Sequence, residues 1–158
     1  MKKSADKGFY LIASGAILFF LVSFLSACQQ KPEQEEDLTS EIIDTWDNGK
    51  PKIIRFFRED ESGQKILVHE KQYYPEGALS MQGDYQNNKR TGIWKSWYED
   101  GSLWSEGRFV NGKRDGLGTV YHPNGKKHIE GAYTNGKRTG VWRSWNENGK
   151  LISEQTLP

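Results

Sequence analysis

Residues 77–101 read GALSMQGDYQNNKRTGIWKSWYEDG, and the chain repeats this pattern with a period of 24 residues. Three glycine columns keep the period, as do a Lys-Arg column and two aromatic columns. Their members are Gly77, Gly101, Gly125 and Gly149; Gly83, Gly107 and Gly131; Gly92, Gly116 and Gly140; Lys89-Arg90, Lys113-Arg114 and Lys137-Arg138; Trp97, Tyr121 and Trp145; and Tyr85, Phe109 and Tyr133. Several columns that share one period indicate a repeat architecture, in which each unit is completed by its neighbours.

Each unit carries two turn signals. One is Asp-Gly or Asn-Gly, as at Asp100-Gly101, which is typical of tight hairpins because both residues accept positive φ. The other is the longer run Asn-Gly-Lys-Arg-x-Gly at residues 111–116, matched at residues 135–140 and, with Asn88 in place of the glycine, at residues 87–92. Residues 103–109 between them alternate in character, which indicates a strand. The sequence therefore predicts an all-β fold: tandem 24-residue antiparallel β-hairpin repeats stacked into one elongated twisted sheet.

The N-terminus has the layout of a secretory signal. Residues 1–7 are cationic, residues 8–24 are largely apolar, and Leu25-Ser26-Ala27 precede Cys28, the only cysteine of the chain. These four residues resemble the lipobox of bacterial lipoproteins, in which the cysteine becomes the acylated first residue. The alternative is a retained transmembrane helix, because residues 8–27 are about long enough to span a bilayer. We expect residues 1–27 to be a lipoprotein signal peptide and Cys28 to carry the lipid.

The rest of the chain divides into three parts. Residues 28–40 hold the lipidated cysteine and an acidic segment without aromatic residues, whose composition predicts a disordered tether. Residues 41–76 are predicted to form a degenerate first β-repeat, and residues 77–158 three repeats followed by a C-terminal half-repeat. No Asp follows Cys28, and in bacterial lipoproteins an Asp there retains the protein at the inner membrane. This resemblance implies the outer membrane, on its periplasmic or surface-exposed side.

Composition excludes several function classes. A net charge of +1 argues against a general nucleic-acid binder, and one cysteine allows neither an internal disulfide nor a cysteine-based metal site. His122 and His128 flank one turn, but two ligands do not make a zinc site. No hydrolase signature or phosphate-binding glycine loop occurs, so we expect neither an enzyme nor a cofactor.

The repeated string Gly-x-Leu-x-x-x-Gly-x-Tyr/Phe-x-Asn-Gly-Lys-Arg-x-Gly-x-Trp-x-x-Trp/Tyr resembles the MORN-repeat variant family. The resemblance covers residues 75–153 well and residues 45–74 loosely. It implies stacked antiparallel hairpins in one long sheet. Many bacterial members are labelled antitoxin components of toxin–antitoxin systems, and several carry lipoprotein signals. An exported antitoxin would require a toxin that also leaves the cytoplasm.

Two sets of repeated side chains are candidate binding sites. The dibasic positions should line one sheet edge at about 10 Å spacing, where they could meet a partner or an anionic surface, although charged turn tips also serve simply to solvate hairpins. The aromatic columns should pack between hairpins, and any that stay exposed could bind sugar rings or a choline-like cation. The two candidate sets are Lys89, Arg90, Lys113, Arg114, Lys137 and Arg138, and Trp94, Trp97, Tyr121, Trp142 and Trp145.

The sequence-based hypothesis for function is a membrane-anchored, non-catalytic interaction or scaffold module at the cell envelope. It is held to the membrane through Cys28 and docks a protein or an envelope component. The first alternative is a module that binds glycan or choline-like ligands through exposed aromatic residues. The second, an antitoxin component, rests on the family label.

Overall fold

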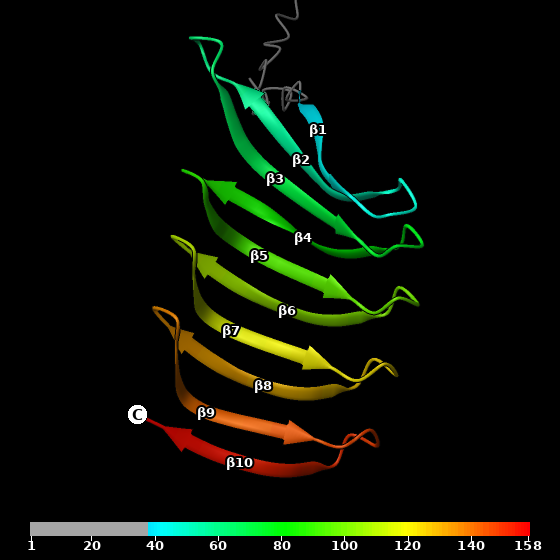
Figure 1. Cartoon of the computed structure of the whole chain (residues 1–158). Coiled ribbons are helices and arrows are strands. Elements are labelled where there is room, and N and C mark those ends of the chain that lie inside the picture. Colours follow the sequence, from blue (N-terminus) through cyan, green and yellow to red (C-terminus); the bar gives the residue numbers. More distant parts are fainter. Residues whose placement is uncertain (1–37) are drawn as a thin grey trace, which may run out of the picture. The chain divides into compact units, whose positions relative to one another are not determined.

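The computed structural model describes residues 38–158, and all of their regular structure is β-sheet (Figure 1). The strands are β1 (Thr39–Thr45), β2 (Pro51–Glu59), β3 (Lys65–Tyr73), β4 (Leu79–Gln86), β5 (Lys89–Trp97), β6 (Leu103–Val110), β7 (Lys113–Tyr121), β8 (Lys127–Thr134), β9 (Lys137–Trp145) and β10 (Leu151–Leu157). They form one antiparallel sheet in which each strand pairs with the next along the chain. The predicted all-β array of stacked hairpins is confirmed.

The N-terminal predictions fall mostly outside this part of the chain. The signal peptide, Cys28 and tether residues 29–37 lie outside the described residues. Thr39 and Ser40, which we assigned to the tether, belong to β1 instead. The described residues contain no helix that is long and apolar enough to cross a membrane.

Hairpin turns alternate between two edges of the sheet, and three turns at one edge differ in type from those at the other edge. The β2–β3 turn, residues 60–64, lies at the first edge but has the turn type of the second. At one edge, two-residue turns join β4 to β5, β6 to β7 and β8 to β9. Both turn residues have positive φ, for example Asn111 (50°) and Gly112 (82°), the type I′ geometry that Asn-Gly favours. Lys113 and Arg114 therefore lie outside the turn and begin β7. We call this edge the lysine edge, because a lysine begins each strand that leaves these three turns.

At the opposite edge the turns are longer, which corrects the prediction made from Asp-Gly and Asn-Gly. Only Gly101 of the Asp100-Gly101 pair has positive φ (84°). The Gly101 amide donates to the Tyr98 carbonyl and the Tyr98 amide to the Ser102 carbonyl, which makes a type I turn followed by a glycine bulge. The Asp100 carboxylate accepts the amide and hydroxyl of Ser102, so it holds the loop without entering the left-handed region.

The packed centre of the sheet is a row along one face, which we call the glycine face. Its members are Gly83, Trp94, Gly107, Gly118, Gly131 and Trp142. The Trp94 ring lies flat on Gly83, where a methyl group would be 2.3 Å from Trp94 Cδ2, and Trp142 lies in the same way on Gly131, at 2.2 Å. Glycine is required here because no other residue leaves room for the ring. Trp94 is only 4% exposed and is, with Leu67, one of the buried apolar side chains of the described sheet.

The row changes at both of its ends. Glu70 of β3 pairs with Gly83 and is 2% exposed, and its carboxylate accepts Nε of Arg55 at 2.7 Å and the Gln72 amide at 2.9 Å. At the other end Gln155 of β10 pairs with Trp142, at the position that glycine holds in earlier repeats. The terminal units thus replace the repeated packing with polar side chains.

Register shifts recur at two places in the repeats. Those beside the turns of the opposite edge fall between Gln72 and Tyr73, between Ser96 and Trp97, and between Val120 and Tyr121. Those at the glycine row fall between Gln82 and Asp84, between Gly107 and Phe109, and between Glu130 and Ala132. A bulge bends its strand and increases the local twist. The repeated bulges account for the bowed strands in Figure 1.

Candidate functional site

The three repeated arginines lie on the aromatic rings of the glycine face. The guanidinium carbon of Arg90 is 3.9 Å from the centre of the Trp94 ring, and that of Arg138 is 4.3 Å from the centre of the Trp142 ring. Such cation–π contacts contribute about 0.5–1 kcal/mol each at exposed sites. The arginines of the dibasic pairs therefore do not extend from the turn tips. Their side chains fold back over the sheet.

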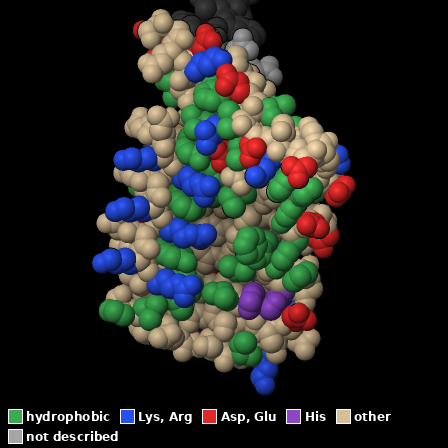
Figure 2. Space-filling model, viewed as in Figure 1, with side chains coloured by type: hydrophobic (Ala, Val, Ile, Leu, Met, Phe, Trp, Pro, Cys, Tyr) green, Lys and Arg blue, Asp and Glu red, His purple; other side chains and the backbone are tan. Residues whose placement is uncertain are grey.

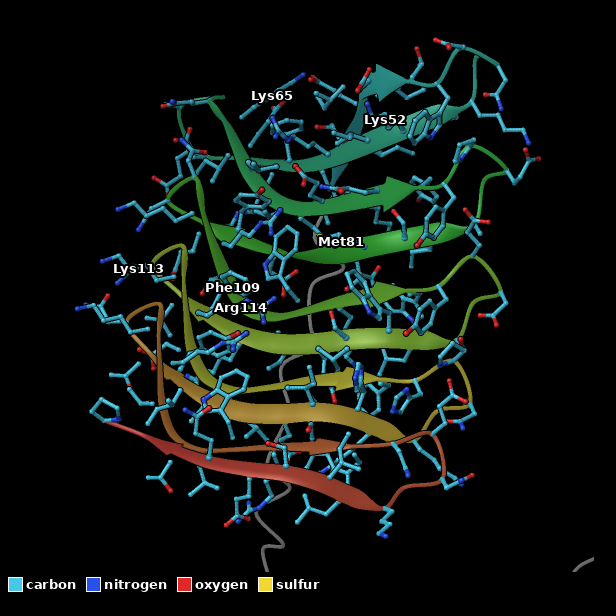
Figure 3. All side chains as sticks on the ribbon, turned by 60° about the horizontal axis from the view of Figure 1, so that its bottom comes forward. Lys52, Lys65, Met81, Phe109, Lys113 and Arg114 are labelled. Atoms are coloured by element: carbon cyan, nitrogen blue, oxygen red, sulfur yellow. The ribbon has the colours of Figure 1, made fainter. Side chains whose placement is uncertain are left out.

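The middle repeat achieves the same packing without a tryptophan. Gly118 stands where the neighbouring repeats have Trp94 and Trp142. The Arg114 guanidinium carbon instead lies 5.4 Å from the Phe109 ring centre and 5.3 Å from that of Tyr133. Figure 3 shows Arg114 and Phe109 together over the sheet, while Lys113 points away from it. The arginine therefore fills space that an indole occupies in the other repeats.

Together these contacts form a continuous ladder, which we call the arginine–aromatic ladder. It consists of Tyr85, Trp94, Arg90, Phe109, Arg114, Tyr133, Trp142 and Arg138. Its rings meet edge to face, for example Tyr85 and Trp94 at 5.4 Å between ring centres. Figure 2 shows columns of basic side chains beside hydrophobic ones on this face. The ladder therefore holds three guanidinium groups at fixed positions against aromatic rings.

None of the three arginines has an acidic partner within residues 38–158. The same holds for Lys89, Lys113 and Lys137, which are exposed at the lysine edge. Basic residues elsewhere in the sheet do have partners: Lys95 pairs with Glu106 and Arg143 with Glu154. The six candidate cations are thus available for an external anion, as is Arg108, which has no acidic partner in the described sheet either.

The five candidate aromatic residues divide between the two faces. Trp94 and Trp142 belong to the ladder, and an arginine already covers each ring. Trp97, Tyr121 and Trp145 lie on the opposite face and are partly buried. The Tyr121 hydroxyl donates to Glu106 at 2.8 Å, on the side of β6 away from Gly107. The two aromatic columns therefore lie on opposite faces of the sheet, and the five rings do not form one surface.

A second set of repeated contacts joins successive repeats and was not predicted. The Tyr74 hydroxyl donates to the Trp97 carbonyl, and the Tyr98 hydroxyl to the Tyr121 carbonyl, both at 2.8 Å. His122, one period on, lies 2.9 Å from the Trp145 carbonyl through Nε2, which must carry the proton because a carbonyl only accepts. The sequence contains the signal: Tyr74, Tyr98 and His122 are hydrogen-bond donors spaced at the 24-residue period.

Two tyrosines that hydrogen-bond to a neighbouring repeat have raised pKa values. Burial raises the pKa of Tyr98, and the charge of Asp100 and the nearby Tyr74 add to the effect. Burial likewise raises the pKa of Tyr121, with a further contribution from its hydrogen bond to Glu106. Both phenols therefore remain protonated donors at neutral pH, so these links between repeats persist over the physiological range.

The two histidines that flank one turn do meet. The rings of His122 and His128 stack with centres 4.3 Å apart, at the position where the preceding repeat has Tyr98 and Trp104 in ring contact at 6.2 Å. The pair thus substitutes for an aromatic contact between strand ends. Across residues 38–158 no group of three or more His, Cys, Asp or Glu side chains is placed to hold a metal ion.

A family model described as MORN repeat variant matches residues 68–87, 90–111, 114–137 and 138–157. The chain belongs to the MORN repeat variant family. Each matched unit is two strands joined by a turn at the opposite edge, so β9 and β10 are a whole fourth unit, although residues 151–157 were predicted as half of one. The first unit begins inside β3 and crosses our predicted boundary at residue 76. No curated protein matches the chain.

Proposed function

We propose that this MORN-repeat protein is a lipid-anchored, non-catalytic interaction module of the cell envelope, which docks an acidic surface of a protein partner on the arginine–aromatic ladder. One observation carries the docking site: Arg90, Arg114 and Arg138 lie on aromatic rings and have no carboxylate partner in the described sheet. In this proposal the repeats supply a binding surface, and no residue of the ladder is catalytic.

The geometry suits carboxylates. A guanidinium is planar, is weakly hydrated and forms bidentate hydrogen bonds to carboxylate groups. A ring beneath it fixes its plane, so less side-chain freedom is lost on binding. Equivalent arginines are two strands apart, about 10 Å, so an extended acidic segment crossing the strands would meet them in turn. Phe109 and Tyr133, which are partly exposed, provide apolar surface beside the charges.

Capture in intact envelopes tests the docking site. Wild-type protein, a variant with Arg90, Arg114 and Arg138 changed to Gln, and a control with Lys95, Arg108 and Arg143 changed to Gln are crosslinked, and the partners are identified by mass spectrometry. We expect one partner, crosslinked through acid-rich peptides, to be captured by wild type and control and lost from the arginine variant. The proposal fails if all three proteins capture the same partners while their melting temperatures agree.

The anchor rests on Cys28 and on residues 1–27, and we place the protein at the outer membrane, periplasmic or surface-exposed. Changing Cys28 to Ser should abolish incorporation of labelled fatty acid and leave an unprocessed precursor. If the serine variant still becomes acylated, lipidation at this residue is wrong. The docking site is judged separately, by the crosslinking experiment.

Glycan or choline-like ligands remain a second candidate function. The observation in their favour is that Trp97, Tyr121 and Trp145 are partly exposed in one column of the face away from the ladder. Aromatic rings in a row offer stacking surfaces for sugars and for quaternary ammonium groups. Binding on a glycan array that is lost on changing Trp97 to Ala, but not on changing Arg114 to Gln, would favour this alternative.

A further inference from the structure

Two tryptophans of the ladder show what a glycine of this sheet can seat. Trp94 of β5 lies on Gly83 of the preceding strand, where a Cβ would be 2.3–2.5 Å from three ring atoms. Trp142 of β9 lies on Gly131 of β8 in the same way, at 2.2–2.7 Å. In each case the arginine near the start of the same strand lies over the indole. An aromatic ring held between bare backbone and a guanidinium is therefore a repeated unit of this structure.

The middle repeat has the glycine and the arginine of this unit but no tryptophan. The glycine is Gly107 of β6, and the residue of β7 that could cover it is Gly118, its cross-strand partner. The atom nearest to a Cβ at Gly107 would be Arg114 Nη1 at 2.9 Å, and the next atoms are 3.8 Å away. We call the surface over these two glycines the middle seat. One guanidinium nitrogen lies where three ring atoms lie in the flanking repeats, so the middle seat is only partly filled.

Arg114 is held over the middle seat more loosely than its counterparts are held on their rings. Its guanidinium carbon is 5.4 and 5.3 Å from two ring centres, against 3.9 Å for Arg90 and 4.3 Å for Arg138. No carboxylate or hydrogen-bond acceptor of the described sheet holds it. The end of a long, flexible side chain without such a partner moves at little cost, so the Arg114 guanidinium can rise from the seat.

We propose that the middle seat receives an aromatic side chain, preferably an indole, from the partner that docks on the ladder. This inference rests on the proposed function and adds the chemistry of the bound segment. With the partner's ring on Gly107, Arg114 lies over that ring, as Arg90 lies over Trp94. Docking then completes in the middle repeat the arrangement that the flanking repeats make from their own residues.

Two rings flank the middle seat. Tyr133 Cε2 is 3.1 Å from where a Cβ on Gly118 would be, and Phe109 lies with Arg114 over the sheet (Figure 3). Both rings are partly exposed. Phe109 already contacts Trp94 edge to face, with ring centres 6.2 Å apart. A bound indole can make the same kind of contact, which favours an aromatic over an aliphatic side chain.

The flanking arginines set the spacing of acids in the bound segment. Arg90 and Arg138 each lie two strands from Arg114, about 9.5 Å. A polyproline II helix repeats every three residues, or about 9.3 Å, so every third side chain points in one direction. A segment with the pattern acid-x-x-Trp-x-x-acid therefore places its carboxylates at Arg90 and Arg138 when its indole fills the middle seat. A β-strand would direct these side chains alternately to opposite sides.

Binding of two labelled heptapeptides to the full-length protein in detergent micelles tests the inference. One is Glu-Pro-Pro-Trp-Pro-Pro-Glu, the other has Ala in place of Trp, and fluorescence anisotropy gives their Kd values. We expect the Trp peptide to bind the wild type about tenfold more tightly, because its indole leaves water. Gly118→Trp fills the seat with the chain's own indole, and Gly107→Ala puts a methyl group where the ring would lie. In both variants the Trp peptide should lose its advantage, while the Ala peptide binds as it does to the wild type.

Two further variants separate the seat from the rest of the sheet. Lys95→Gln changes the other face of β5 and should leave both Kd values unchanged. Arg114→Gln should reduce the advantage of the Trp peptide about two- to fivefold, the effect of one exposed cation–π contact. Equal Kd values of the two peptides on the wild type, or an advantage that persists in both glycine variants, overturns the inference. If the peptides bind equally and both are lost when Arg90, Arg114 and Arg138 are changed to Gln, docking of acids stands and only the aromatic site is wrong.

Discussion

The contact between Trp142 and Gly131 gives a sharp prediction, because the structure states what an added methyl group would meet. A Cβ at residue 131 would lie 2.2, 2.3 and 2.7 Å from three ring atoms of Trp142. Carbon atoms normally approach to about 3.5–4.0 Å, so the indole would have to move by more than 1 Å. Overpacking of this kind costs about 1–3 kcal/mol. For a folded unit of this size that is roughly 4–12 °C in melting temperature.

The test is a double-mutant cycle followed by thermal melting in circular dichroism. Gly131→Ala should lower the melting temperature by that amount in the wild-type chain. In a Trp142→Ala background the same change should cost nothing, or should stabilise by up to about 1 kcal/mol, because alanine restricts the unfolded chain more than glycine does. Gly118→Ala is the matched control: its Cβ would lie 3.1 Å from Tyr133 Cε2, a contact that a small ring shift relieves. An equal cost of Gly131→Ala in both backgrounds would refute the packing argument.

Three further predictions follow from the repeats. Tyr98→Phe removes the hydroxyl that donates to the Tyr121 carbonyl, so it should lower the free energy of unfolding by about 0.5–1.5 kcal/mol in a urea titration. Tyr85→Phe should cost little, because the Tyr85 hydroxyl has no partner in the described sheet. Deleting residues 101–124 should give a shorter folded sheet with a sharp melting transition, whereas deleting residues 101–112 should abolish that transition, because turns would then meet strands. Hydrogen bonds from the hydroxyl and amide of Ser102 lower the pKa of Asp100 below 3.8. The contribution of the Asp100 carboxylate to stability is therefore complete above pH 3.8 and is lost as the pH falls through the lowered pKa. Asp100→Asn should therefore make the melting temperature less dependent on pH in acid than it is in the wild type, and an unchanged slope would count against the argument.

The fold was predictable because the features that determine it are local and repeated. The 24-residue period and the turn residues specify antiparallel hairpins, and strand alternation places Trp94 and Trp97 on opposite faces. The turn types were harder to predict from the sequence. Asn111-Gly112 and Asp100-Gly101 look equivalent in sequence, yet both residues of the first pair have positive φ and only the glycine of the second does. In the longer turns a side chain bonds the loop, but its position varies: Asp100 accepts Ser102, whereas Asn146 accepts Asn148 and Lys150.

The candidate site was predictable in its residue types but not in its geometry. Sequence spacing puts Lys113 and Arg114 side by side, yet the lysine projects from the edge while the arginine turns back onto Phe109 and Tyr133. That choice depends on rings from two other strands, which no local pattern reports. The burial of Glu70 is equally non-local, because its charge is offset by Arg55 from the neighbouring strand.

Gln155 changes what the last strand of the sheet offers to a further strand. In each earlier repeat a glycine seats the indole or guanidinium of the following strand, but Gln155 puts a side chain at that position. A strand with a ring or an arginine at the repeat position, added beside β10 by a second copy, would meet this side chain where it would otherwise meet bare backbone. The edge of β10 therefore lacks the glycine seat that joins one repeat to the next within the sheet.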